Sequence, residues 1–546
     1  MLTGSDSAKR LECGGLPALL DGQAREKAGA SSRTPDASRQ PTGARHIFIV
    51  RGAGHGTSAL TRWAGAASIA LVTYRAMAAQ RGWFAATGLS AGLCAAVLGA
   101  ALALLAAAGP KEPPPTGRLI ASPEPGWPQW RGPRRDGICE ETGLLQQWPA
   151  GGPALLWKAS GLGRGYSAPI ITGGRIYLAG EVGEELRIFA LDLQGRPVWQ
   201  SKNGRAWRGP YPGARASCVY SEGRLYHRNA YGRVACLDAA TGAELWAVDV
   251  LERFGGKTIT WGLAENLLVD GPRLIVTAGG TTALMAALDK KTGATVWTTE
   301  PLRLGRSDDP AQERLTEPEG QADSASYGSP ILFTLGGRRL IVSSSLRHLF
   351  GVDADTGRLL WTRPFPTRYS VIASTPVLVG DAVFVTAPDT DCGGLFRITC
   401  AYSPLCPAAG ERARVRGSHI RVEKLWSADL DTCHGGQVYV NGALYGAYYR
   451  QKGWACLDGR TGQVLYRTKE LAQGSVLYAD GRLYCLSQEG EMALLKPTPH
   501  GFEFTGRFRL VPARTDDAWT HPVILDKRLY LRYQDTLYCY DVQAGP

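Results

Sequence analysis

The stretch "CLDAATGAELW", from Cys236 to Trp246, returns along the chain with small changes. An apolar residue precedes an aspartate, a Thr-Gly pair follows, and an aromatic residue closes the phrase. The clear copies are "ALDKKTGATVW" (287–297), "GVDADTGRLLW" (351–361) and "CLDGRTGQVLY" (456–466), and the weaker ones are "ALDLQGRPVW" (190–199) and "CYDVQAG" (539–545).

Each copy has the chemistry of a turn between two strands. The aspartate, such as Asp238, can accept backbone N–H groups two residues further on. The glycine, such as Gly242, adopts a positive φ at low steric cost. The closing aromatic, such as Trp246, suits packing against a neighbouring sheet. Because the aspartate recurs in every unit, we interpret it as structural rather than catalytic.

The spacing of the closing aromatics sets the size of the repeat. Between these aromatics, four short strands separated by glycine-containing turns fit into most units, for example within 217–248. Repeats of about 40–50 residues with four strands each are typical of β-propeller blades. The two longest gaps predict insertions at 303–325 and 392–420. The aromatics are Trp157, Trp199, Trp246, Trp297, Trp361, Trp426, Tyr466 and, weakly, Phe508.

The two ends of the chain predict how the ring closes. The last unit, 520–545, stops after three strands, whereas "PALLWKA" (Pro153–Ala159) precedes the first complete unit. We therefore predict an all-β, eight-bladed propeller in which this N-terminal strand completes blade eight. Such a closure removes open sheet edges. Seven blades is the alternative if the weak unit Gly474–Leu510 is not a blade.

The repeated pattern A-L-D-x-x-T-G-x-x-x-W resembles the repeat of pyrroloquinoline-quinone (PQQ) type propellers. These include quinoprotein alcohol dehydrogenases and BamB-type outer-membrane assembly propellers. From about Trp127 onward, "WPQWRGPRRDG" (127–137), "GYSAPII", "CHGG" and "GSVLYADGRLYCLS" resemble bacterial envelope proteins of the BamB-like or PQQ-binding-like β-propeller group. This resemblance implies the propeller fold, but fold alone does not imply function.

The front of the chain has a different character. No charge occurs from Gly82 to Pro110, which is long enough to cross a bilayer. Arg75 and Arg81 precede this run, so we expect the N-terminus in the cytoplasm and the propeller outside, in the periplasm of a bacterial envelope. Met77 begins a sequence like an export signal. An uncleaved anchor and a cleaved signal both remain open.

We therefore divide the chain into four parts. Residues 1–76 are a disordered tail or misassigned upstream sequence, and 77–110 are a signal-anchor or transmembrane helix. Residues 111–126 are a Pro-rich linker, and 127–546 are the propeller. Trp127 and Trp130, ahead of the first blade, are expected to cover one face of the ring.

The charge pattern argues against nucleic-acid binding. The chain has 61 basic and 49 acidic residues, a net charge of +12. Half of this excess lies in residues 1–81, where 11 basic residues face 5 acidic ones (11 − 5 = 6). The other basic residues are spread over strand ends and turns, whereas a nucleic-acid site needs a concentrated basic face.

Six of the 12 cysteines fall into two groups. Three occupy equivalent repeat positions where other blades have alanine or glycine, so we expect buried small residues there: Cys236, Cys456 and Cys539. Three others cluster in the fifth-blade insertion and are disulfide candidates: Cys392, Cys400 and Cys406. No Cys/His set has zinc spacing, so no metal site is predicted.

The loops that enter the first strand of each blade should surround one mouth of the channel. Most of them carry small or hydroxyl residues, but Glu265, His434 and His521 do not. With Arg215, Trp261 and Trp519 nearby, they could bind an anionic or carbohydrate-like ligand, or a metal. Anion binding through histidinium would weaken as pH rises through about 6.5. In the alternative interpretation, each of these side chains hydrogen-bonds the backbone of a neighbouring blade.

The family resemblance also implies an enzyme to test. PQQ dehydrogenases have two adjacent cysteines against the cofactor, a tryptophan floor, and a calcium held by Glu, Asn and Asp. Here no two cysteines are adjacent, and Glu265–Asn266 is only a fragment of a calcium site. We therefore predict a membrane-tethered binding scaffold for protein or glycan partners, without a cofactor. The alternative is a PQQ-dependent oxidoreductase with PQQ and calcium.

Overall fold

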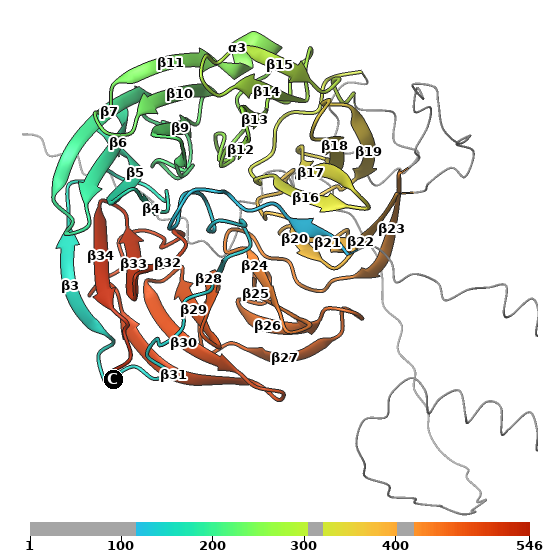
Figure 1. Cartoon of the computed structure of the whole chain (residues 1–546). Coiled ribbons are helices and arrows are strands. Elements are labelled where there is room, and N and C mark those ends of the chain that lie inside the picture. The colour runs from blue at the N-terminus through green and yellow to red at the C-terminus, as the bar shows by residue number, and fades with distance from the viewer. Residues whose placement is uncertain (1–115, 304–319, 401–419, 546) are drawn as a thin grey trace, which may run out of the picture. The chain divides into compact units, whose positions relative to one another are not determined.

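The computed structural model describes residues 116–303, 320–400 and 420–545. They form eight sheets arranged in a ring, which confirms the all-β, eight-bladed propeller (Figure 1). The single α-helix among these residues is α3 (Val250–Phe254). None of the described helices has the length and apolar character of a membrane span. The helix predicted for 77–110 and the tail 1–76 lie outside the described residues.

Within each blade the first strand lies nearest the ring axis, and successive strands lie further out (Figure 1). Blade one consists of β4 (Ile170–Thr172), β5 (Arg175–Val182), β6 (Glu185–Asp192) and β7 (Pro197–Arg205), and blade two of β8 (Val219–Ser221), β9 (Arg224–Arg228), β10 (Arg233–Asp238) and β11 (Glu244–Asp249). Blade three consists of β12 (Leu268–Asp270), β13 (Arg273–Thr277), β14 (Met285–Asp289) and β15 (Thr295–Thr298), and blade four of β16 (Ile331–Leu335), β17 (Arg338–Ser344), β18 (His348–Asp353) and β19 (Leu359–Pro364). Blade five consists of β20 (Val377–Val379), β21 (Ala382–Val385), β22 (Gly394–Cys400) and β23 (Ile420–Ser427), and blade six of β24 (Gln437–Val440), β25 (Ala443–Tyr448), β26 (Gly453–Asp458) and β27 (Val464–Thr468). Blade seven consists of β28 (Gly474–Ala479), β29 (Arg482–Ser487), β30 (Glu491–Pro497) and β31 (Phe502–Arg509), and blade eight of β32 (Val523–Leu525), β33 (Arg528–Tyr533), β34 (Thr536–Asp541) and β3 (Ala154–Ala159).

The last two sheets decide the blade count. The weak seventh unit forms the complete sheet β28 to β31, so the ring has eight blades rather than seven. In the eighth sheet, β3 lies antiparallel to β34, with Trp157 opposite Cys539. This sheet therefore joins a strand from the front of the propeller to the three C-terminal strands.

The repeated phrase connects neighbouring blades. Asp238 Oδ1 accepts hydrogen bonds from the backbone N–H of Ala240 and Thr241, at 3.1 and 2.8 Å. Gly242 follows with φ +76°, and a Cβ there would lie 2.6 Å from Cε3 of Trp199 in the preceding blade. The same aromatic-on-glycine contact recurs for Trp157 on Gly195, Trp246 on Gly293, Trp297 on Gly357, and Trp426 on Gly462.

Residues 117–148 are here called the inner strap. The strap crosses the middle of the ring and then runs outward, where the Trp148 backbone N–H donates to Thr505 O in the outermost strand β31 (Figure 1). Its two short strands, β1 (Arg118–Leu119) and β2 (Ile138–Cys139), pair with the innermost strands β16 and β28. Between them, the backbone of Trp127 exchanges hydrogen bonds with Ile171 at 2.7 and 2.9 Å. The described part of the expected linker, from residue 116, thus lies on the ring.

The apolar core lies between neighbouring sheets, as in the cluster shared by blades one and two. The repeat-position cysteines Cys236, Cys456 and Cys539 are buried in these interfaces, as expected. Cys392 forms no disulfide with any cysteine whose side chain the structure describes. The side chain of Cys400 and the whole of Cys406 lie outside the described residues, so a disulfide among the three candidates remains a prediction.

The aromatic-on-glycine contact gives a first prediction. Gly242→Ala should lower the free energy of unfolding by about 2–5 kcal/mol, combining the cost of a positive φ with overpacking against Trp199. Gly223 is a matched control, because it has the same φ of +76° but nothing within 4 Å of its Cβ position. Gly223→Ala should cost only about 1–2 kcal/mol. Urea denaturation measures both, and equal losses would contradict the contact's role.

Candidate functional site

The two ends of the first strands form different surfaces. The turns that follow these strands contact the inner strap: Gly380 O accepts from the strap backbone, and Glu222 and Asp526 donate backbone N–H to strap glutamates. The loops that enter the same strands lie at the opposite end. The strap therefore covers one end of the channel and leaves the strand-entry end as the open mouth.

The turn of the strap fills the channel as far as the strand starts. Arg135 donates from Nη2 to Asn266 O at 2.8 Å and from Nη1 to Leu267 O at 2.9 Å. Arg131 donates from Nη2 to the carbonyls of Asp136 and Gln437. Both are 3% exposed. Burial lowers the pKa of Arg131 to about 10 and of Arg135 to about 9, so both remain charged at neutral pH.

Six rings surround the open mouth and are here called the aromatic mouth. Trp519 stacks on His434 with ring centroids 4.1 Å apart. Tyr166 and Tyr211 lie 4.9 and 5.1 Å from the Trp519 ring. Five of the rings are half-buried and His434 is exposed. The members are Tyr166, Tyr211, Trp261, Tyr327, His434 and Trp519.

Arg215 holds the backbone of the mouth loops in place and does not offer a free charge to a ligand. Its guanidinium donates to four backbone carbonyls, including Tyr211 O at 2.7 Å and Trp261 O at 2.7 Å. Trp261 is further held by Tyr327, whose hydroxyl lies 3.5 Å from the Trp261 backbone nitrogen. The predicted site residues Arg215, Trp261 and Trp519 thus belong to one mouth, and Arg215 has the backbone-bonding role.

Glu265 does not lie at the mouth. Its Oε2 is 2.6 Å from Nη1 of Arg228, with both side chains at most 1% exposed. Thr277 donates to the same carboxylate from its backbone and, at 2.6 Å, from its hydroxyl. Desolvation raises the pKa of Glu265, although Arg228 opposes this. The carboxylate therefore completes a buried ion pair between β9 of blade two and the loop that enters β12 of blade three.

This pairing answers whether Glu265–Asn266 could hold calcium beside PQQ. The guanidinium of Arg228 occupies the position next to the carboxylate that a cation would need. The Asn266 Oδ1 accepts from Ser217 N at 2.6 Å. No group of three or more His, Cys, Asp or Glu side chains in the described ranges could hold a metal. The donor set does not fit calcium-bound PQQ at this position.

His434 and His521 come from blades six and eight and lie close together. The Nε2 of His521 is 3.2 Å from the backbone oxygen of His434. Burial lowers the pKa of His521 to about 3, and the charge of Arg131 adds to this. His434 is exposed at the mouth, but the protein around it still lowers its pKa, with Asp517 opposing. The ordinary histidine value near 6.5 therefore applies to neither ring.

Some mouth residues were not singled out from the sequence. Tyr166 and Tyr327 are the first residues of the entry stretches "YSAP" and "YGSP", so their place in that row was the available signal. Tyr211 lies in the long loop after β7 with φ +54°, and nothing in the repeat marks it. Arg131 and Arg135 belong to "WPQWRGPRRDG", where the tryptophans drew attention instead.

Sequence comparison finds one matching family and one relative. The family described as outer membrane protein assembly factor BamB matches residues 184–390. The lanthanide-dependent methanol dehydrogenase of Methylacidiphilum fumariolicum (strain SolV) is 28% identical over 194 residues, 32% of this chain and 29% of that protein. The chain therefore spans less than a third of the length of this curated relative.

Structure comparison finds propellers of the same kind. Quinohemoprotein alcohol dehydrogenase from Comamonas testosteroni is similar with a TM-score of 0.51 and 12% identity, over 77% of this chain and 81% of that one. BamB from Moraxella catarrhalis gives a TM-score of 0.48 and 14% identity, over 71% and 99%. At such identities the likeness shows the fold alone.

His521 gives a prediction about pH. The pKa of His521 in the folded protein lies below the value near 6.5 in the unfolded chain. As pH falls, this imidazole therefore takes up a proton in the unfolded chain before it does so in the folded protein. His521→Gln lacks this effect. The difference in unfolding free energy, wild type minus variant, should be constant above pH 7. Below pH 6.5 it should fall by up to about 1.4 kcal/mol per pH unit. Urea denaturation from pH 8 to 5 measures it, and a flat difference would contradict a buried neutral imidazole.

Proposed function

Because this chain belongs to the PQQ-like β-propeller family, we propose that it is a binding scaffold that holds a protein partner at its aromatic mouth. The observation that carries the proposal is the asymmetry of the ring. One end of the channel is filled by the inner strap, and the other presents half-buried aromatic side chains. Such anchors dominate the energetics of protein interfaces.

The mouth is organised before any partner arrives. Arg215 ties Tyr211 and Trp261 to the ring through backbone carbonyls, and Trp519 packs among Tyr166, Tyr211 and His434. Side chains that are already ordered lose little conformational entropy on binding, which favours affinity. This supports a rigid recognition surface rather than a flexible one.

A protein partner fits the chemistry of the mouth better than a glycan. Sugar hydroxyls lose water on binding and need polar partners in return. Two polar side chains that the sequence suggests for this role, Arg215 and Glu265, already have partners within the ring. Exposed faces of Trp519 and Trp261 suit apolar side chains of a polypeptide instead.

The cell envelope is the proposed setting. The matching family is described by an outer-membrane assembly factor, and the uncharged stretch 82–110 suits a membrane tether. Oxidoreductase activity, which the methanol dehydrogenase has by name, is not part of the function that we propose for this chain. The reason is that Glu265 forms an ion pair with Arg228.

Photocrosslinking in cells tests the proposal. A photoreactive amino acid at Tyr166 or Trp261 should give adducts that contain peptides of a second protein. The same amino acid at Val296 or Leu465, which are 53% and 49% exposed on outer strands, should give few. Trp519→Ala should reduce the mouth adducts at least several-fold, as expected for a hot-spot residue.

The outcomes separate the candidates. Adducts that contain carbohydrate but no peptide would favour a glycan ligand. Equal adducts from the mouth and the outer strands, or none from the mouth, would refute the proposal.

A further inference from the structure

Positive charge exceeds negative charge at the ring axis. Three guanidiniums are buried there, those of Arg131, Arg135 and Arg228, at 1–3% exposure. One buried carboxylate, Glu265, accompanies them and pairs directly with Arg228. The remaining two arginines donate to backbone carbonyls and a side-chain amide, which carry no net charge.

The carboxylate of Asp136 does not neutralise this excess of positive charge. Asp136 raises the pKa of Arg131 from a distance, but its side chain bonds Arg134 Nε at 2.8 Å. Burial lowers the pKa of Arg135, the charge of Glu265 raises it and, to a smaller extent, that of Arg131 lowers it. Buried charge without a counter-charge is costly, so the axis favours an additional anion.

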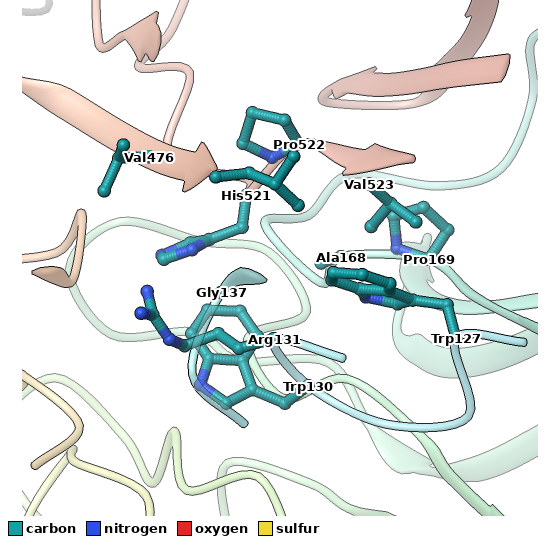
Figure 2. Close-up of a pocket in the computed structure, with 11 residues that line it drawn as sticks. Trp127, Trp130, Arg131, Gly137, Ala168, Pro169, Val476, His521, Pro522 and Val523 are labelled. Carbon is teal, nitrogen blue, oxygen red and sulfur yellow. The ribbon is translucent and has the colours of Figure 1, made fainter. Parts of the chain in front are cut away.

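A small cavity lies beside this charge. Its volume is about 10 Å³, and its lining includes Trp127, Trp130, Arg131, Val476 and His521 (Figure 2). The Nη1 of Arg131 is buried and has no hydrogen-bond acceptor among the described residues. Figure 2 shows the Arg131 guanidinium and the His521 ring reaching toward the same space.

Gly436 lies against the Arg131 guanidinium, although it is not part of the cavity lining. A Cβ on Gly436 would lie 2.2 Å from Arg131 Nη1 and 3.2 Å from His521 Cε1. Any side chain there would collide with the arginine. The second glycine of "CHGG" therefore permits the close approach of strap, blade six and blade eight around one unused N–H donor.

We propose that this cavity binds one monovalent anion of halide size, with chloride as the ligand in ordinary solutions, through Arg131 Nη1. A water molecule would satisfy the hydrogen bond but leave the charge uncompensated. Among common anions a halide comes nearest in size to this cavity, which has about the volume of one water molecule, whereas sulfate is much larger. The anion contacts the strap and blades one, seven and eight, whose residues line the cavity, so halide stabilises the closed ring.

The test uses the full chain in sodium chloride, sodium bromide or sodium methanesulfonate at constant ionic strength. The thermal midpoint should rise by a few degrees with halide and stay constant with methanesulfonate, since a ligand of the folded state stabilises it. Crystals grown in bromide should show an anomalous peak within hydrogen-bond distance of Arg131 Nη1.

Variants separate this site from a general salt effect. Arg131→Gln should lose the halide dependence. Arg532→Gln is the matched control, because Arg532 is also buried and donates to four backbone carbonyls but does not line this cavity. It should be destabilised yet keep the halide dependence. If Arg131→Gln fails to fold, the bromide peak in the wild type decides.

Three results would overturn the proposal: equal midpoints in chloride and methanesulfonate, unchanged halide dependence in Arg131→Gln, or no bromide at the cavity. The last result, with density for one neutral molecule, would assign a buried water instead.

Discussion

Eight strand edges meet around the axis of this ring, and none of them can pair within its own sheet. The first strand of each blade bonds to the second on one side and faces the channel on the other. Unpaired backbone groups in a closed interior cost free energy. The inner strap supplies the missing partners through β1, β2, the Trp127 backbone and the side chains of Arg131 and Arg135.

Arginine is suited to this position for a physical reason. Its planar fork carries several donors, so one side chain can satisfy several backbone carbonyls where a further strand could not fit. The consequence is electrostatic, because Arg131 and Arg135 keep their charge when buried. The same device recurs at Arg215, which donates to four carbonyls and sets the aromatic mouth. Hydrogen bonds from arginine side chains to backbone carbonyls therefore both close one end of the channel and shape the other.

Local chemistry was predictable from the sequence, and contacts between distant residues were not. The turn at Asp238 and Gly242 follows from residue type alone, but the contact of Gly242 with Trp199 depends on the neighbouring blade. Glu265 broke the strand-entry pattern and so resembled a ligand-binding residue. Its partner Arg228 ends β9 in the preceding blade, 37 residues earlier, and only the ring brings them together.

The site shows the same division. The strand-entry row located the mouth, and Trp261 and Trp519 lie there. The state of His521 was not predictable, because its pKa depends on burial beneath the mouth and on Arg131 from the strap. The sequence located the loop that carries His521, whereas the protonation state of its ring depends on packing contacts from three parts of the chain.

Hydrogen–deuterium exchange tests most directly whether the strap holds the inner edges of the ring. The comparison is between the full chain and a chain that begins at Gly151, which keeps every strand from β3 to β34. The account predicts that the amides of Ile171, Tyr220 and Tyr478, each bonded to a strap carbonyl, lose protection before the outer strands do. Unchanged protection of these three amides, with an unchanged thermal midpoint, would contradict it.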